Sequence, residues 1–460
     1  MTGNNMKYIH KFTTLTLCAV LLLSGCNTDK AVTTTTDTST VTEEVTTTEA
    51  TTAASTTTTS ATTTMTTTKT TTAPKEPELP ESDFGCFLQD DGTVYISWYE
   101  GSDKDVIIPE YIGKYPVTSM MLPLWPESHF NGKEYVPDNG TEIETVTLPK
   151  TMTRLQFHEY YEFQTIKSYI VDPENEKYTA VDGVLYSKDM TKLVLYPPAK
   201  EGEFTVPESV TEIGSGSFSH TDKITAVNIG GNVRTIGMGA FERSSVSEVN
   251  IAEGLESVEW CAFLASNIES IVLPKTVRKI EARAFELSKL RSITLPTAID
   301  EFGTAVFAKT ELSEINLIDN GEGLYMWNDI LRKGDELIRM IKGSNVEKLI
   351  LDRTFTSKDV VFEGCTGLKV IEILDGCDFI ISNTIYGDFW DCPSIERLYI
   401  PASVVSAPFY HYYQSMSPDL VVYTPENGGN SFDLRNSGDK CRFVFVDSYD
   451  EYLKVTSENG

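Results

Sequence analysis

The chain has 460 residues, of which 40% are hydrophobic and 23% charged, and its formal net charge is −29 at pH 7. Such an acidic chain is repelled by the phosphates of nucleic acids and by anionic lipid surfaces, so neither is expected as a partner. The apolar residues are unevenly distributed, and not all of the chain can belong to a folded domain.

Residues 1–25 have the pattern of a secretory signal peptide. A basic start precedes the apolar run Phe12 to Leu23, which is too short to span a bilayer as a mature helix. The sequence LSGC that ends at Cys26 resembles the lipobox of bacterial lipoproteins, which implies cleavage before Cys26 and lipid attachment to it. The alternative is a soluble signal followed by an ordinary cysteine. If Cys26 carries lipid, this lipid is the only membrane contact expected.

Residues 26–83 are dominated by threonine with alanine, serine and a few acids, and they end in a proline-rich stretch. This composition has almost no apolar side chains to offset the entropy lost on ordering, so we expect a disordered stalk. The density of threonine also suggests O-glycosylation, which a mass measurement on the mature protein tests.

A repeat of 22 residues organises the centre of the chain, from Val246 to Leu317. Three sets of large apolar residues recur at this period: Val249, Ile271, Ile293 and Ile315; Val258, Ile280 and Phe302; and Phe263, Phe285 and Phe307. A strict period of this length is typical of a solenoid, in which each unit buries its apolar face against its neighbours.

Alternation within a unit predicts a short strand. In the sequence EVNI, Val249 and Ile251 point inward, and Glu248 and Asn250 point outward. An alanine precedes the repeated phenylalanine at positions 240, 262 and 284, where a larger side chain would crowd the ring. No asparagine ladder follows the strand, so the curvature of a common leucine-rich repeat is not assumed.

The segment DGTVYISWYEGSDKDVIIPEYIGKYPVTS, at residues 91–119, and the later phrase DGVLYSKDMTKLVLYPP, at 182–198, resemble segments of the BspA-like leucine-rich-repeat surface proteins of bacteria. The resemblance covers residues 84–446. It implies a mainly β solenoid of short parallel strands with inserted hairpins and terminal caps, and a role in adhesion. No cofactor is expected.

Aligning the repeated phrase along the chain predicts one strand in each of 13 coils. The central residues of these strands are Val106, Val146, Tyr169, Phe204, Val227, Val249, Ile271, Ile293, Ile315, Leu349, Ile371, Leu398 and Val421.

Three segments interrupt the spacing of these strands: residues 117–140, residues 172–200, which read as hairpins, and residues 319–345, which suit either a short helix or another hairpin. Both ends of a solenoid need caps, for which we assign residues 84–105 and 419–446. Residues 447–460 are expected to be a frayed tail.

Residues with catalytic or metal-binding chemistry are few. The histidines after the signal are His129, His158, His220 and His411, and no motif of a metalloprotease, nucleophile elbow, phosphate loop or calcium loop is present. The sequence HEYYE at 158–162 has one histidine where a zinc protease needs two, and GSGSF at 214–218 is expected to be a turn. We therefore expect no enzyme and no metal site.

Six cysteines follow the proposed anchor, without a CxxC pair: Cys86, Cys261, Cys365, Cys377, Cys392 and Cys441. This spacing argues against zinc, whereas disulfides between some of them are left open. Cys261 lies beside the repeated Ala-Phe pair, so we expect it to be a buried, small apolar residue.

Two sets of residues are candidates for binding. The first is the series of outward residues on consecutive strands: Ala226, Asn228, Glu248, Asn250, Ser270, Val272, Ser292, Thr294, Glu314 and Asn316. The second is an aromatic patch formed by Trp125, Tyr410, Tyr412 and Tyr413. The alternatives are a merely solvated solenoid face and aromatic residues that serve packing.

Together these features predict a lipoprotein on the extracellular face of the bacterial envelope. It would bind a protein or another cell through the outward residues. The alternative is a polysaccharide-binding accessory of a glycan-degrading system, which saturable sugar binding that depends on Tyr412 or Trp125 would favour.

Overall fold

The computed structural model describes residues 79, 82–126, 128–130, 135–137, 142–157, 165–318, 323–357, 361–377, 379–380, 392–404, 419–425 and 442–458. The chain divides into two units, Met1–Lys75 and Glu76–Gly460, and the described residues belong to the second. The predicted signal peptide, Cys26 and nearly all of the predicted stalk lie outside the described residues.

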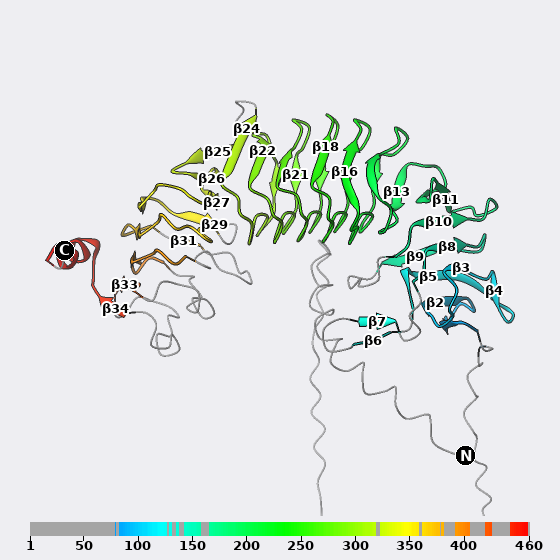
Figure 1. Cartoon of the computed structure of the whole chain (residues 1–460). Coiled ribbons are helices and arrows are strands. Elements are labelled where there is room, and N and C mark those ends of the chain that lie inside the picture. The colour runs from blue at the N-terminus through cyan, green and yellow to red at the C-terminus, as the bar shows by residue number, and fades with distance from the viewer. Residues whose placement is uncertain are drawn as a thin grey trace, which may run out of the picture. The chain divides into compact units, whose positions relative to one another are not determined.

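The described part is a mainly β solenoid, in which each regular coil contributes one longer and one shorter strand (Figure 1). The longer strands are β3 (Asp105–Ile107), β8 (Thr145–Leu148), β10 (Ser168–Val171), β14 (Gly202–Thr205), β16 (Ile224–Ile229), β18 (Glu248–Ile251), β20 (Ser270–Val272), β22 (Ser292–Pro296), β24 (Glu314–Ile318), β28 (Lys348–Leu351), β30 (Val370–Ile373), β32 (Arg397–Tyr399), β33 (Val421–Thr424) and β34 (Arg442–Phe445).

These longer strands pair in parallel within four sheets, ordered β10-β8-β3, β14-β16-β18, β20-β22-β24 and β28-β30-β32-β33-β34. Twelve of the thirteen predicted central residues are confirmed by the register, which pairs, for example, Val227 with Val249 and Ile293 with Ile315. The thirteenth, Val421, is off by one residue, because Leu398 pairs with Val422, and Val422 is the buried one.

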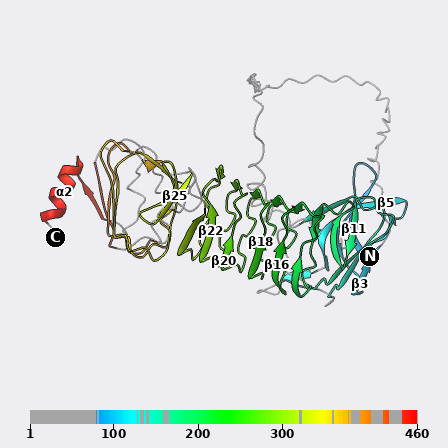
Figure 2. The same cartoon turned by 90° about the horizontal axis from the view of Figure 1, so that it is seen from above.

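The shorter strands form a second row, in sheets separate from those of the longer strands. Eight of them make one sheet in the order β11 (Tyr178–Val181), β12 (Val184–Ser187), β13 (Lys192–Leu195), β15 (Glu212–Ile213), β17 (Thr235–Ile236), β19 (Ser257–Val258), β21 (Lys279–Ile280) and β23 (Glu301–Phe302). A second sheet follows the order β25 (Leu324–Trp327), β26 (Ile330–Lys333), β27 (Glu336–Met340), β29 (Phe355–Ser357) and β31 (Phe379–Ile380). Figure 2 shows β16, β18, β20 and β22 as successive neighbours.

Two interruptions in the repeat are antiparallel hairpins. The expected hairpin in residues 172–200 is β11–β12–β13, and the segment 319–345 is also a hairpin, β25–β26–β27, rather than a helix. In each case the last strand of the hairpin pairs in parallel with the next short strand, β13 with β15 and β27 with β29. The insertions therefore continue the second row of strands instead of ending it.

A stack of phenylalanine rings fills the corner of each coil. Phe218, Phe241, Phe263, Phe285 and Phe307 are all buried, and successive ring centroids lie 4.8, 4.9, 5.1 and 5.9 Å apart in stacked geometry. The backbone N–H of Phe241 donates to the carbonyl of Ala262 in the next coil at 2.7 Å, and Phe263 donates to Ala284 in the same way. The alanine and the ring of the preceding coil are buried in the same core cluster, which leaves little room for a larger side chain.

Left-handed backbone conformations bracket this corner. The residue two before the phenylalanine and the residue two after it both have positive φ angles, as at Cys261 (φ 55°) and Ala265 (φ 53°), or Ala305 (φ 53°) and Lys309 (φ 55°). Gly239 (φ 58°) occupies the first of these positions in another coil. The predicted GSGSF turn is such a corner, with Gly216 at φ 65° and Phe218 in the stack, and Cys261 is buried as expected.

A buried hydroxyl follows each phenylalanine by three residues, a feature that we did not predict. Its members are Thr221, Ser244, Ser266, Ser288 and Thr310. The hydroxyls of Thr221, Ser288 and Thr310 donate to the carbonyl of the phenylalanine in their own coil at 2.6 to 2.9 Å. These bonds close the tight corner in their coils.

The two ends of the solenoid differ. The predicted N-terminal cap, residues 84–105, contains the antiparallel strands β1 (Phe84–Leu88) and β2 (Val94–Tyr99). They continue into a sheet with β4 (Tyr111–Ile112), β5 (Tyr115–Pro126) and β9 (Arg154–Phe157). Strand β6 (Ser128–Phe130) pairs with β7 (Tyr135–Pro137) in a separate two-stranded sheet. Of the predicted C-terminal cap, residues 419–446, the structure describes β33 and β34, which pair in parallel.

The prediction of a frayed tail at 447–460 is wrong for residues 449–458, which form helix α2 (Tyr449–Glu458). Tyr452 on this helix is 1% exposed, and its ring lies 4.9 Å from Tyr399 and 5.0 Å from Tyr423. Tyr449, Tyr452 and Val455 share one face of the helix, a spacing of three residues that the sequence analysis overlooked. No described helix has the length and apolar run needed to cross a bilayer.

Phe285→Ala removes the ring between Phe263 and Phe307. We expect the free energy of unfolding to fall by about 3–5 kcal/mol, because the neighbouring rings cannot collapse into the space. The measurement is urea denaturation of the full chain. Met238→Ala, at a side chain that is 48% exposed, is the control and should change stability by less than about 0.5 kcal/mol. An equal loss of stability in both variants would contradict the stabilising role of the ring stack.

Ala305→Gly tests the left-handed corner. We expect this change to stabilise the protein by about 0.5–1 kcal/mol. Glycine has no Cβ and avoids the steric cost of a positive φ, which is larger than the entropic cost of fixing a glycine. The same substitution at the buried Ala284, whose φ is not positive, should destabilise the protein by about 1 kcal/mol. A loss of stability in both variants would refute the assignment of strain to the corner.

Candidate functional site

The outward sides of β14, β16, β18, β20, β22 and β24 form the candidate binding surface, here called the ladder face. Of the nine residues predicted to line it, Glu248, Asn250, Ser270, Val272, Glu314 and Asn316 are exposed, and Asn228, Ser292 and Thr294 are half-buried. Ala226 also points outward in the register but is 7% exposed, so it offers little surface to a ligand.

The register arranges these residues in rows across the strands. Asn228 lies opposite Asn250, and Val272, Thr294 and Asn316 lie opposite one another on the next three strands. Neighbouring strands in a sheet are separated by about 4.8 Å, so each row presents a side chain at that interval. Such rows suit a partner that extends across several strands.

The amide side chains on the ladder face are held by one another. Asn250 donates from Nδ2 to Oδ1 of Asn228 at 3.0 Å and to Oε1 of Glu248 at 2.8 Å. Asn228 donates from Nδ2 to the hydroxyl of Thr205 at 3.4 Å. The pair Glu314 and Asn316 repeats the Glu248–Asn250 contact at 3.0 Å, three coils away. These contacts fix the side chains before a ligand arrives, which reduces the entropy lost on binding.

The ladder face is negatively charged. Its strands carry Glu203, Glu248 and Glu314 as exposed outward residues and contain no lysine or arginine. An anionic ligand is therefore disfavoured at this surface, and a neutral or cationic one is accepted.

The long-strand sheet is interrupted between β18 and β20. In the described chain, β18 is the last strand of one parallel sheet and β20 the first of the next, and no hydrogen-bonded ladder joins them. A shallow hollow lies at this place, lined by residues of β16, β18 and β20 that include Asn228, Glu248, Asn250 and Val272. The hollow falls in the centre of the predicted ligand surface.

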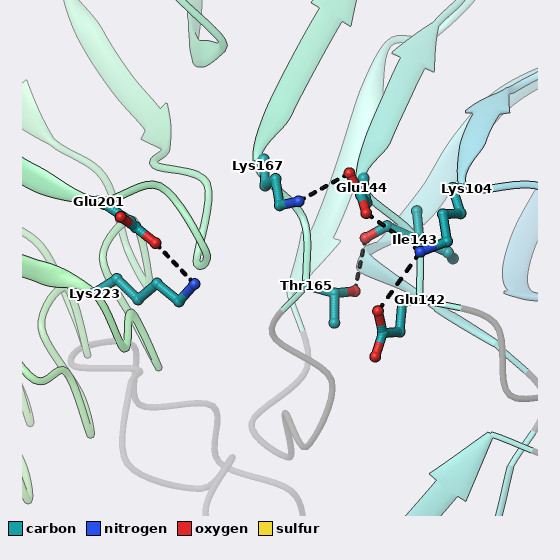
Figure 3. A network of polar contacts seen from close by, with 8 residues as sticks. All are labelled: Lys104, Glu142, Ile143, Glu144, Thr165, Lys167, Glu201 and Lys223. Atoms are coloured by element: carbon teal, nitrogen blue, oxygen red, sulfur yellow. Dashed lines mark hydrogen bonds and ion pairs between the residues drawn. The ribbon is translucent and has the colours of Figure 1, made fainter.

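A rim of alternating charges runs along the N-terminal ends of the long strands (Figure 3). Lys167 Nζ lies 2.9 Å from Glu144 Oε2, Lys104 Nζ lies 3.4 Å from Glu144 Oε1, and Lys223 Nζ lies 2.9 Å from Glu201 Oε1. The hydrogen bonds from Lys167 and Lys104 lower the pKa of the Glu144 carboxyl. Because each of these lysines is paired, the rim does not offset the negative charge of the ladder face.

The same side of the solenoid is covered at its C-terminal end. Glu372, Tyr399 and Tyr423 lie opposite one another on β30, β32 and β33, in outward positions. Helix α2 packs on them, and the hydroxyls of Tyr449 and Tyr452 donate to the Glu372 carboxylate at 2.5 and 2.8 Å. A bare outer face is therefore a property of the central coils and not of every coil.

The N-terminal long strands present an exposed apolar surface instead. Ile107 on β3 is 71% exposed and Ile170 on β10 is 49% exposed, and both lie opposite Thr147 on β8. Sequence analysis did not single out these two residues, although their outward position follows from the same alternation.

The predicted aromatic patch is not described. Trp125 belongs to β5, but its side chain lies outside the described residues, as do Tyr410, Tyr412 and Tyr413. Its role in binding stays a prediction.

His220 is the histidine whose side chain the structure describes. Burial lowers its pKa to about 4, and its Nδ1 lies 2.7 Å from the hydroxyl of Ser219. It is neutral at pH 7 and belongs to a coil corner, with a φ of 55°. Within the described residues, no group of three or more histidine, cysteine, aspartate or glutamate side chains is arranged to hold a metal ion.

Two regions of the chain, residues 202–325 and 340–424, match the family described as BspA type leucine rich repeat region, in 6 copies. Residues 202–325 and 340–424 of this chain are BspA-type leucine-rich repeats. The matched region includes every strand of the ladder face.

No curated protein is significantly similar in sequence. Among solved structures, a leucine rich cell surface protein from Faecalibacterium prausnitzii A2-165 is 17% identical, with a TM-score of 0.36, over 83% of this chain and 98% of that one. The pneumococcal vaccine antigen PcpA is 13% identical, with a TM-score of 0.30, over 80% and 99%. A leucine-rich repeat protein from Eubacterium ventriosum ATCC 27560 is 15% identical, with a TM-score of 0.29, over 80% and 95%.

Proposed function

We propose that this BspA-type protein is a non-catalytic binding protein of the bacterial cell surface, which attaches its cell to a protein or to another cell through the ladder face. The observation that carries this proposal is the contrast along one side of the solenoid. Helix α2 covers the outward residues of β30, β32 and β33, whereas the outward polar residues of β14 to β24 are exposed or half-buried.

The ladder face has the chemistry of a recognition surface. Its amides and carboxylates are held by mutual hydrogen bonds, and its rows extend over two neighbouring sheets of three strands each. A few well-placed contacts on a surface of this width supply affinity without a deep pocket. The signal pattern, the lipobox resemblance at Cys26 and the threonine-rich stalk support display on the outside of the envelope.

A polysaccharide-binding accessory is the second candidate. The amide, hydroxyl and carboxylate groups of the ladder face are also suitable partners for sugar hydroxyls. The two functions are separated by probing the full chain against immobilised fibronectin, laminin and collagen and against a glycan array. Saturable binding to sugars alone, lost on Tyr412→Ala or Trp125→Ala, would favour the second function.

Asn250→Arg tests the ladder face with whichever probe binds. We expect at least a ten-fold loss of affinity, because the new side chain removes two hydrogen bonds and projects above the row. Affinity is measured by surface plasmon resonance.

Ser209→Arg is the matched control, because it adds the same charge at an exposed position outside the ladder face. It should leave affinity within about two-fold. If Asn250→Arg binds as well as the unaltered chain, the ladder face is not the binding surface.

A further inference from the structure

We infer that the hollow between β18 and β20 receives a lysine or arginine side chain of a partner protein. This inference names the chemistry of one contact within the proposed function and depends on it. Three observations support it: an opening toward the apolar interior, a carboxylate at the edge of that opening, and no cationic residue around it.

The opening comes from the break in the sheet. Because no ladder joins β18 to β20, the inward-facing Val249 and Ile271 line the hollow and are 6% and 3% exposed. At the same positions, Val227 and Ile293 on β16 and β22 are 0% exposed, whereas Phe204 and Ile315 on the edge strands β14 and β24 are half-buried. The hollow therefore has an apolar floor, which the strands paired on both sides, β16 and β22, lack.

The edge of the hollow is polar and anionic. Glu248 and Asn250 stand on β18, and Ser270 stands on β20. The contact from Asn250 engages Oε1 of Glu248, which leaves the Oε2 side of this exposed carboxylate facing solvent. No lysine or arginine is among the residues that line the hollow.

An apolar floor beneath a carboxylate selects for a side chain with both properties. Lysine and arginine have aliphatic stems that pack on apolar surface and cationic heads that bind carboxylates. Val272, which is 59% exposed at the edge, extends the apolar surface that the stem would contact. A neutral sugar would use the polar edge but not the floor, and an acidic side chain would be repelled by Glu248.

The chain contains a matched control for this site. Glu314 and Asn316 on β24 repeat the contact between Glu248 and Asn250, and β24 ends its sheet as β18 does. Neither residue is among those that line the hollow, so Glu314 is the control for a carboxylate held in the same way outside it.

The test uses the full chain and three labelled peptides, acetyl-Gly-Gly-X-Gly-Gly-amide with arginine, lysine or citrulline at X. Citrulline has nearly the shape of arginine but no charge. We expect the arginine and lysine peptides to bind at least ten-fold more tightly than the citrulline peptide, by fluorescence anisotropy at low salt. Equal binding of all three would overturn the inference.

Glu248→Gln should weaken the arginine peptide by roughly ten-fold or more, and Glu314→Gln should leave its affinity unchanged. Val272→Lys, which places the protein's own ammonium group at the edge, should also abolish binding. Both altered positions in the hollow are exposed, so melting temperatures should not change. An unaltered affinity in Glu248→Gln, or an equal loss in Glu314→Gln, refutes the site.

The same variants separate this inference from the proposed function. If the peptides fail to bind but Asn250→Arg still abolishes binding of the macromolecular probe, the ladder face is retained and only the cationic contact is refuted. If no probe depends on Asn250, the proposed function itself fails.

Discussion

The corner of each coil, where one phenylalanine ring stacks on the next, is the interaction on which the rest of the structure depends. It joins successive coils through ring contacts of about 5 Å and through backbone bonds from each phenylalanine to the residue before the next ring. A coil that lost this contact would be joined to its neighbour by the short strand, by the long strand where it is paired, and by single backbone bonds such as that from Asn267 to Ser244. The spacing of the corners therefore sets the spacing of the outward rows on the ladder face.

At the hairpin β25–β26–β27, a bond to a side chain replaces the backbone bond that joins one corner to the next. In the regular coils, the N–H of the residue two after the phenylalanine donates to a backbone carbonyl of the next coil, as Leu287 does to Ala308. After the last regular corner the hairpin intervenes, and Lys309 donates instead to the side chain of Glu363, at 2.6 Å. Arg339 pairs with the same carboxylate at 2.9 Å, and both charges are buried. Removing one partner of such a pair is costly, so Glu363 and Arg339 are expected to tolerate little change.

Much of this fold could be predicted from the period of the sequence. The repeats at Val249, Val258 and Phe263 fix the inward residues of both strands and of the corner, because each kind of residue returns at a constant interval. The hairpin phrase at 182–198 was recognised in the same way. Features without a large apolar signal were missed. The corner hydroxyls of Ser288 and Thr310 are small and polar, and helix α2 depends on Glu372, which is far away in the sequence.

The candidate site was likewise predicted only in part from the sequence. Alternation predicts which residues of β16 to β24 point outward, because it is a local property of a strand. It does not predict the break between β18 and β20, since both strands carry the same repeat and the missing ladder shows only in the folded chain. Nor does it predict that Ala226 is covered or that Tyr399 and Tyr423 lie beneath a helix.

Hydrogen–deuterium exchange of the full chain, resolved by mass spectrometry at the level of peptides, tests the central role of the stacked corners most directly. The account predicts that peptides containing Phe241, Phe263 and Phe285 exchange as slowly as the paired long strands, because their amides are bonded from coil to coil. Exchange of these corner peptides at the rate of an unstructured chain, while the long strands stay protected, would contradict it.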